Sequence, residues 1–277
     1  MSTMRRETIR KDLTPLSWEN LGERGQWKAL RETLVDLARD PGGFFDRMAV
    51  SGGLYEPVGF LWVFLAAVIL PGFPLALAYF GLTAPAPEQV SVDVYNYHLL
   101  LPRATGILAA LLPLALVAGT AWALLCGTML YLGSIPFGGS RWEGAISTWC
   151  YAASAALAPL SAGLCLGAVV ATGCYFLVDL LPAAEAIGRF STYALVGLGL
   201  LAGLAWFAIC LFAGCARALE LPGARGAATG IFGLALSGTV LVGWPVAGVL
   251  WGARGAAGAA AGLAILVVFL ISAGGNE

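Results

Sequence analysis

Charged residues are scarce in this sequence: Lys, Arg, Asp and Glu make up 11% of 277 residues, against about 25% in ordinary soluble domains. Hydrophobic residues make up 59%. The few charges are also unevenly placed, because residues 1–56 contain nine of the fifteen basic and nine of the sixteen acidic residues. This composition excludes an ordinary soluble domain. It predicts an all-α polytopic membrane protein with a hydrated N-terminal segment, 1–56, and an apolar helical domain, 57–277.

Patterns that carry chemistry are missing as well. We find no P-loop, HExxH or GxSxG motif and no paired carboxylates on a predicted span. The single histidine, His98, has no ligand partners nearby, and we interpret it as an interfacial packing residue. All six cysteines lie in apolar runs without CxxC spacing and are interpreted as packing residues: Cys126, Cys150, Cys165, Cys174, Cys210 and Cys215. We therefore predict no enzymatic activity, cofactor, metal site or nucleic-acid partner.

Long apolar runs begin only near Pro57, which is too late for a cleavable signal peptide, so we expect the first span to remain as a signal anchor. A bilayer core of about 30 Å needs about 20 apolar helical residues. Six uncharged runs are long enough: Val58–Leu82, Ala104–Phe137, Gly144–Val178, Phe190–Ala216, Gly226–Ala253 and Gly255–Ala273.

The number of spans is left between five and six. Pro159 interrupts the run 144–178, which predicts either a short interfacial piece followed by a full helix or one long kinked helix. The last two runs have almost no loop between them. Orientation follows from the basic residues beside the spans. Because nine of them precede the first span, the N-terminus is predicted to be cytoplasmic.

Helical periodicity within the N-terminal segment predicts a helix at about residues 26–40. One apolar stripe consists of Trp27, Leu30, Leu34, Leu37 and Ala38. Pro41, followed by two glycines, should end this helix. Two interpretations remain open. The helix lies in the headgroup layer, with Trp27, Phe44, Phe45 and Met48 as anchors, or its stripe packs on the ends of the spans or on a partner protein.

Polar residues near the span ends are the remaining site candidates. The loop Gly138, Gly139, Ser140, Arg141, Trp142 and Glu143 offers charge and an aromatic side chain for a cytoplasmic contact, or is an ordinary turn. Asp179 and Arg254 are candidate membrane-boundary polar residues. Small residues at four-residue spacing, such as Gly199 and Gly203, favour close helix packing and are compatible with a homo-oligomer.

Several segments, in order, resemble the Yip1 family of integral membrane proteins, and above all its bacterial branch. They are "PLSWEN" (15–20), "LARDPGGFFDRM" (37–48), "GGLYEPVGFLW" (52–62), "PFGGSRWEGAISTWCYAASAALAP" (136–159) and "LFAGCARALELPGARGAA" (211–228). Leu54, Tyr55 and Pro57 fit the family's D-L-Y-G-P-F-W motif, but Gly53 replaces its Asp and Glu56 replaces its Gly. Together the matched segments cover about residues 15–240, and the Yip1-like membrane domain about 45–240.

The resemblance implies a five-span bundle with a cytoplasmic N-terminus, in a bacterial cytoplasmic (inner) membrane. Eukaryotic members are associated with Rab GTPases and vesicle traffic. This role carries over poorly to the present chain, because its departures at Gly53 and Glu56 fall on the family motif. We therefore expect a non-enzymatic membrane protein that binds or organises lipids or partner membrane proteins. The alternative is a small-molecule or lipid permease, with Pro159 and Pro182 breaking helices around a polar site. A membrane-embedded enzyme is a third, less favoured class.

Overall fold

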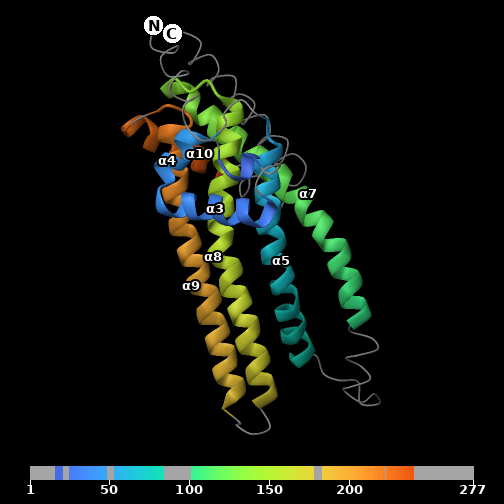
Figure 1. Cartoon of the computed structure of the whole chain (residues 1–277). Coiled ribbons are helices and arrows are strands. Elements are labelled where there is room, and N and C mark those ends of the chain that lie inside the picture. Colours follow the sequence, from blue (N-terminus) through green and yellow to red (C-terminus); the bar gives the residue numbers. More distant parts are fainter. Residues whose placement is uncertain are drawn as a thin grey trace, which may run out of the picture. The chain divides into compact units, whose positions relative to one another are not determined.

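The structure is a computed structural model that describes residues 16–20, 25–48, 53–83, 101–177, 183–221 and 223–239. Every regular element within these ranges is a helix (Figure 1). In chain order they are the 3₁₀ turn η1 (Trp18–Asn20), α3 (Gln26–Arg39), α4 (Pro41–Arg47), α5 (Tyr55–Thr83), α7 (Leu101–Ser134), the 3₁₀ turn η3 (Ile135–Phe137), α8 (Trp142–Leu177), α9 (Ala184–Arg217) and α10 (Ala224–Gly238).

Among the described residues, three segments are long and apolar enough to cross a membrane, judged by length and composition: Leu112–Phe137, Trp142–Cys174 and Ala186–Arg217. A shorter apolar helix covers Tyr55–Pro71. These segments agree with an all-α membrane protein. The predicted run 226–253 begins within α10, but its remainder and the run 255–273 lie outside the described residues. The count of five or six spans therefore stays a prediction.

The run around Pro159 forms one continuous helix. α8 extends from Trp142 to Leu177 with Pro159 in its interior. Of the two sequence-based alternatives, the single long helix is found, and the short piece followed by a separate helix is not. Proline removes one backbone donor and crowds the preceding turn. Neighbouring helices can accommodate such a position in a membrane-spanning segment.

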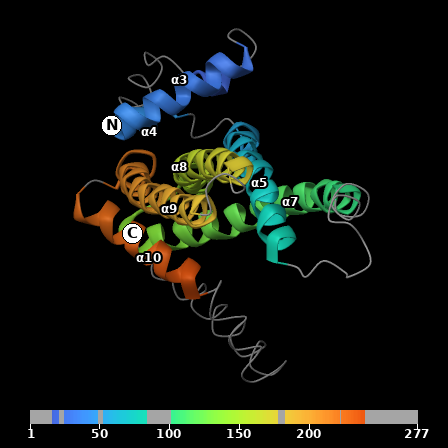
Figure 2. The same cartoon turned by 90° about the horizontal axis from the view of Figure 1, so that it is seen from below.

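The chain forms two compact units, which are described separately. Unit 1 contains Met1–Phe60, Ala121–Ala153 and Phe207–Glu277, and unit 2 contains Leu61–Thr120 and Ser154–Trp206. In unit 2, α8 and α9 run side by side (Figures 1 and 2). A methyl group added at Gly163 would lie 2.6 Å from the Leu195 carbonyl oxygen, and one added at Gly199 would lie 2.7 Å from that of Pro159. The two backbones therefore approach as closely as glycine permits.

Large apolar side chains cover the outer surface of unit 2. Exposed examples on α8 and α9 are Leu166, Val169, Leu198, Leu201 and Leu204. Contiguous apolar patches of this kind are unusual on a soluble monomer. In a bilayer the same side chains contact lipid without penalty, which fits the length and composition of these helices.

Unit 1 has a denser core. Every α8 residue from Gly144 to Ala153 is buried, which means that protein surrounds this end of the helix on all sides. α10 packs beside α7 and α9 (Figure 2). Gly133 of α7 faces Gly233 of α10, and Gly230 of α10 lies against the Phe212 ring of α9. Small residues thus permit close helix contact in unit 1 as well.

The glycine contact between α8 and α9 predicts a difference between two identical substitutions. Gly199→Ala should lower the free energy of unfolding by about 1–3 kcal/mol, because the new methyl group overlaps a backbone carbonyl. Gly197→Ala is the matched control, since a methyl group there meets nothing within 4 Å. The midpoint of thermal unfolding in one detergent measures both. Equal midpoints would contradict the close backbone contact.

Candidate functional site

α3 and α4 meet at a single residue. Asp40 ends α3 and is also the N-cap of α4, where its Oδ1 accepts a hydrogen bond of 2.9 Å from the Gly43 amide. Pro41 occupies the first turn of α4, a position where its missing N–H costs nothing. The predicted break after α3 is therefore present, but the segment after it is a second helix. This helix carries Phe44 and Phe45.

Five aromatic residues form one group in unit 1, which we call the aromatic cluster: Trp18, Phe44, Phe45, Phe60 and Tyr151. Phe44 makes edge contacts with Phe45 at 5.2 Å and Tyr151 at 5.1 Å between ring centroids. Phe60 lies 5.4 Å from Trp18 and 5.3 Å from Tyr151. Such pairs contribute about 0.5–1.5 kcal/mol beyond their burial. The cluster joins η1, α4, α5 and α8.

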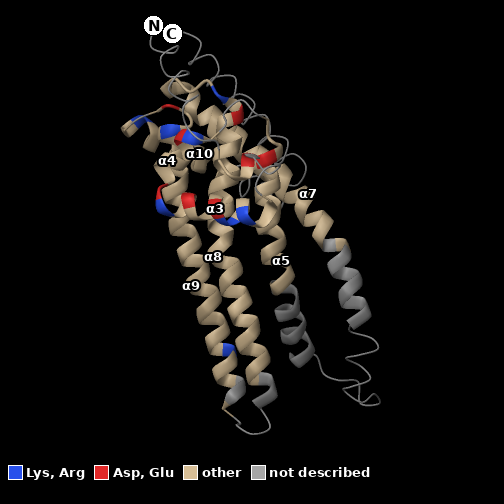
Figure 3. Ribbon diagram, viewed as in Figure 1, with Lys and Arg blue, Asp and Glu red and all other residues tan. Residues whose placement is uncertain are grey.

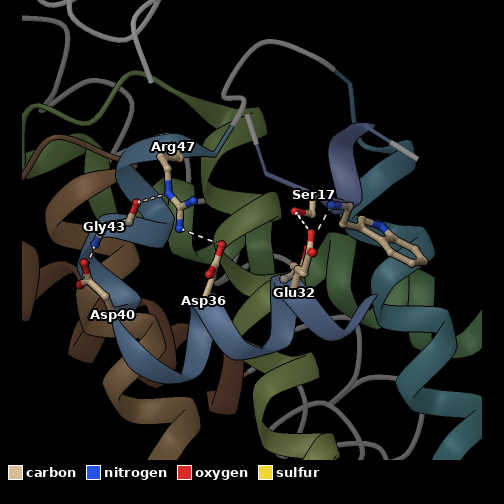
Figure 4. A network of polar contacts seen from close by, with 8 residues as sticks. Ser17, Glu32, Asp36, Asp40, Gly43 and Arg47 are labelled. Atoms are coloured by element: carbon tan, nitrogen blue, oxygen red, sulfur yellow. Dashed lines mark hydrogen bonds and ion pairs between the residues drawn. The ribbon is translucent and has the colours of Figure 1, made fainter. Parts of the chain in front are cut away.

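Backbone and side-chain hydrogen bonds attach η1 to two helices. The Trp18 indole N–H donates to the Glu56 carbonyl of α5 at 2.7 Å, and the Trp18 amide donates to Thr33 Oγ1 of α3 at 3.0 Å. Ser17 Oγ donates to Glu32 Oε2 at 2.9 Å (Figure 4). In the sequence, Trp18 is an aromatic residue within a charged stretch, which is the one indication that it could be buried. The periodicity of the segment does not indicate its partners.

Ion pairs connect several described elements of unit 1. Arg47 of α4 pairs with Asp36 of α3 at 3.0 Å (Figure 4), and Asp46 of α4 pairs with Arg217 of α9 at 3.5 Å. The third joins Arg141 to Glu220 at 3.1 Å. Within the described residues, charges gather around α3, α4 and the helix ends, while long stretches of α8 and α9 carry none (Figure 3). All three pairs are partly exposed, so each contributes about 0–1 kcal/mol.

The interpretation of Phe44, Phe45 and Met48 as headgroup anchors requires correction. All three side chains are buried within the protein, because α4 turns them toward the α8 side of unit 1, where Phe44 contacts Tyr151. Their burial fits the other interpretation, in which this segment packs on the ends of the spans. Trp27 differs, since 82% of its surface is exposed. Its role as an interfacial anchor stays a prediction.

The buried face of α3 is also displaced from the predicted stripe. Ala29, Thr33 and Leu37 are buried, whereas Trp27 and Ala38, two members of the predicted stripe, are exposed. Polar contacts set this orientation. Thr33 accepts a hydrogen bond from the Trp18 amide. Glu32 accepts one from Ser17, and Asp36 pairs with Arg47. Hydrophobicity alone pointed to a different face.

Of the predicted loop 138–143, residues 138–141 form a structured turn after η3, and Trp142 and Glu143 begin α8. Gly138 adopts a left-handed conformation (φ 90°), and the Gly139 amide donates to the Ser134 carbonyl at 2.9 Å. Arg141 pairs with Glu220, and the Trp142 indole donates to Thr128 Oγ1 at 3.2 Å. Much of the loop's polar capacity is therefore used within the chain. Ser140 and Trp142 remain exposed and Glu143 half-buried.

Asp179 and Arg254 lie outside the described residues, as does His98. No group of three or more His, Cys, Asp or Glu side chains suited to a metal ion occurs in the described part of the chain. Comparison with protein-family models, curated proteins and solved structures found no match. What the described site can do is hold the N-terminal helices rigidly against α5, α8 and α9.

The aromatic cluster predicts unequal effects for two aromatic residues of the N-terminal segment. Phe44→Ala should lower the free energy of unfolding by about 3–5 kcal/mol, because a fully buried ring is removed. It should also increase tryptic cleavage at Arg39 and Arg47 in micelles, since α4 loses its attachment. Trp27→Ala, at an exposed position, should leave both measurements unchanged. Equal cleavage in the two variants would show that Phe44 does not hold α4 in place.

Proposed function

We propose that the chain is a non-enzymatic integral membrane protein of the Yip1-like type that organises or binds lipids or partner membrane proteins. In this proposal it has five or six spans, lies in a bacterial inner membrane and keeps its N-terminus cytoplasmic. The observation that supports it most is the attachment of η1, α3 and α4. The aromatic cluster and two of the ion pairs hold them in place and leave one side of α3 exposed.

Rigid attachment favours binding for a physical reason. A flexible tail loses conformational entropy when it binds, whereas a preorganised surface has already been ordered by folding. α3 is held through Thr33 to η1 and through Asp36 to α4. Its exposed side chains therefore form a fixed surface beside the spans. A mere linker preceding the first span would have no need of these contacts.

The segments behind the family resemblance meet in unit 1. Trp18 comes from "PLSWEN", Phe44 from "PGGFF" and Tyr151 from the stretch after the Gly-Gly-Ser loop, and all three belong to the aromatic cluster. A shared core explains why these separate segments would occur together in one family. This convergence supports the Yip1-like assignment as a proposal.

Transport is the alternative function. The α8–α9 contact in unit 2 leaves no room for a substrate between those helices at Gly163 and Gly199, which argues against a passage there. One observation favours transport: Thr148 Oγ1, Trp149 Nε1 and Thr229 Oγ1 are buried in unit 1 without a hydrogen-bond partner among the described residues. Buried polar atoms are normally satisfied, so a polar solute or water is a fitting partner for them.

Site-specific photo-crosslinking in intact membranes tests the proposed function. Benzoyl-phenylalanine in place of Trp27 should form a discrete adduct with a partner protein, a second copy or lipid, because that side chain is exposed beside the spans. The same probe in place of Tyr193, which is exposed on α9 of unit 2, is the control for random collisions in the bilayer. Identical adduct patterns at both positions, together with a strictly monomeric purified protein, would overturn the proposal.

Reconstituted liposomes test the alternative. A permease would accelerate solute or lipid movement above the rate of protein-free liposomes, and Thr148→Val would reduce that rate because the orphaned hydroxyl is removed. We expect no acceleration by the wild-type protein. A rate that the valine variant lowers would replace the proposed function with transport.

A further inference from the structure

The acidic and the basic residues of α3 occupy different arcs of the helix. Glu32, Asp36 and Asp40 all point toward η1 and α4 (Figure 4). Their partners are the Ser17 hydroxyl, the Arg47 guanidinium and the Gly43 amide. The two acids of α3 and its C-cap Asp40 therefore have their partners on the side that faces η1 and α4.

The side of α3 opposite its buried residues Ala29, Thr33 and Leu37 carries cations and apolar groups. At 100° per residue, Lys28, Arg31 and Arg39 fall on one side of the helix together with Trp27 and Val35, and all five are exposed. No acidic residue of α3 falls within this arc. The helix as a whole is nearly neutral, yet this surface, which we call the outer face of α3, is cationic and aromatic.

The attachment of α3 places it where the chain enters the membrane. Thr33, midway along α3, accepts a hydrogen bond from Trp18, and Trp18 donates to the carbonyl of Glu56. The first apolar run begins at Val58, two residues after Glu56. In both views α3 lies crosswise to the unit 1 part of α8 (Figures 1 and 2). A helix that crosses a spanning helix in this way runs along the membrane surface.

We propose that the outer face of α3 binds the headgroups of anionic phospholipids. This inference rests on the proposed function and names the lipid class. The three cations complement an anionic surface, because the acids that flank them are engaged by Ser17, Arg47 and the Gly43 amide. Tryptophan favours the headgroup level. The face extends about 18 Å from Trp27 to Arg39 at 1.5 Å per residue, so it matches an extended lipid surface better than a single small anion.

The test compares nanodiscs of phosphatidylcholine with nanodiscs that also contain phosphatidylglycerol, using the full chain. Hydrogen exchange of the peptide covering 26–39 should be several-fold slower in the anionic discs at low salt, and high salt should abolish the difference. Each basic residue at such a surface contributes a factor of about five. The triple variant Lys28→Gln, Arg31→Gln, Arg39→Gln should therefore exchange at the same rate in both kinds of disc.

Arg225→Gln is the matched control, because Arg225 is an exposed cation outside α3; this variant should keep the wild-type difference. The thermal midpoint of the triple variant should match the wild type, since the three side chains are exposed. Equal exchange of the wild type in both discs, or a difference that survives in the triple variant, overturns the lipid inference. In either case, a protein crosslinked at position 27 would still support the proposed function. Failure of the lipid inference is therefore distinguishable from failure of the proposed function.

Discussion

The contact between Phe44 and Tyr151 is the interaction on which the N-terminal part of the structure depends. It joins α4, a helix of seven residues, to a completely buried stretch of α8. So short a helix is unstable by itself. Fully burying one Phe side chain contributes roughly 1.5–3 kcal/mol, whereas each partly exposed ion pair contributes about 0–1 kcal/mol. The aromatic rings therefore provide the stability, and Asp46 and Arg47 direct α4 toward α9 and α3.

Unit 2 obeys a different constraint. Its helices expose large apolar side chains, and in a bilayer there is no hydrophobic driving force to bring such helices together. Close backbone approach must supply the attraction through van der Waals contact, which is why glycine occurs where α8 and α9 touch. Gly163 and Gly199 lie against carbonyl groups, whereas Gly197, two residues away on α9, contacts nothing. Spacing in the sequence alone does not separate these two kinds of glycine.

Sequence patterns predicted the features that arise locally. The all-α class, the span-length helices and the break after Arg39 follow from apolar run length and from Pro41. The face of α3 and the burial of Phe44 did not follow, because both depend on distant partners. Thr33 meets a residue fifteen positions earlier in the chain, and Phe44 meets Tyr151 of another helix. Hydrophobic periodicity identifies the most apolar face of a helix and carries no information about contacts with distant residues.

The same separation explains how a nearly neutral segment acquires a charged surface. The net charge of α3 sums Glu32 and Asp36 with Lys28 and Arg31 and takes no account of where the four side chains lie. Folding directs the two acids to Ser17 and Arg47 and leaves the two cations outside. The contacts that hold α3 in place are thus also the contacts that remove negative charge from its outer face. The same contacts therefore attach the helix and determine the charge of its exposed surface. The composition of the segment does not show this, whereas the positions of the acids' partners do.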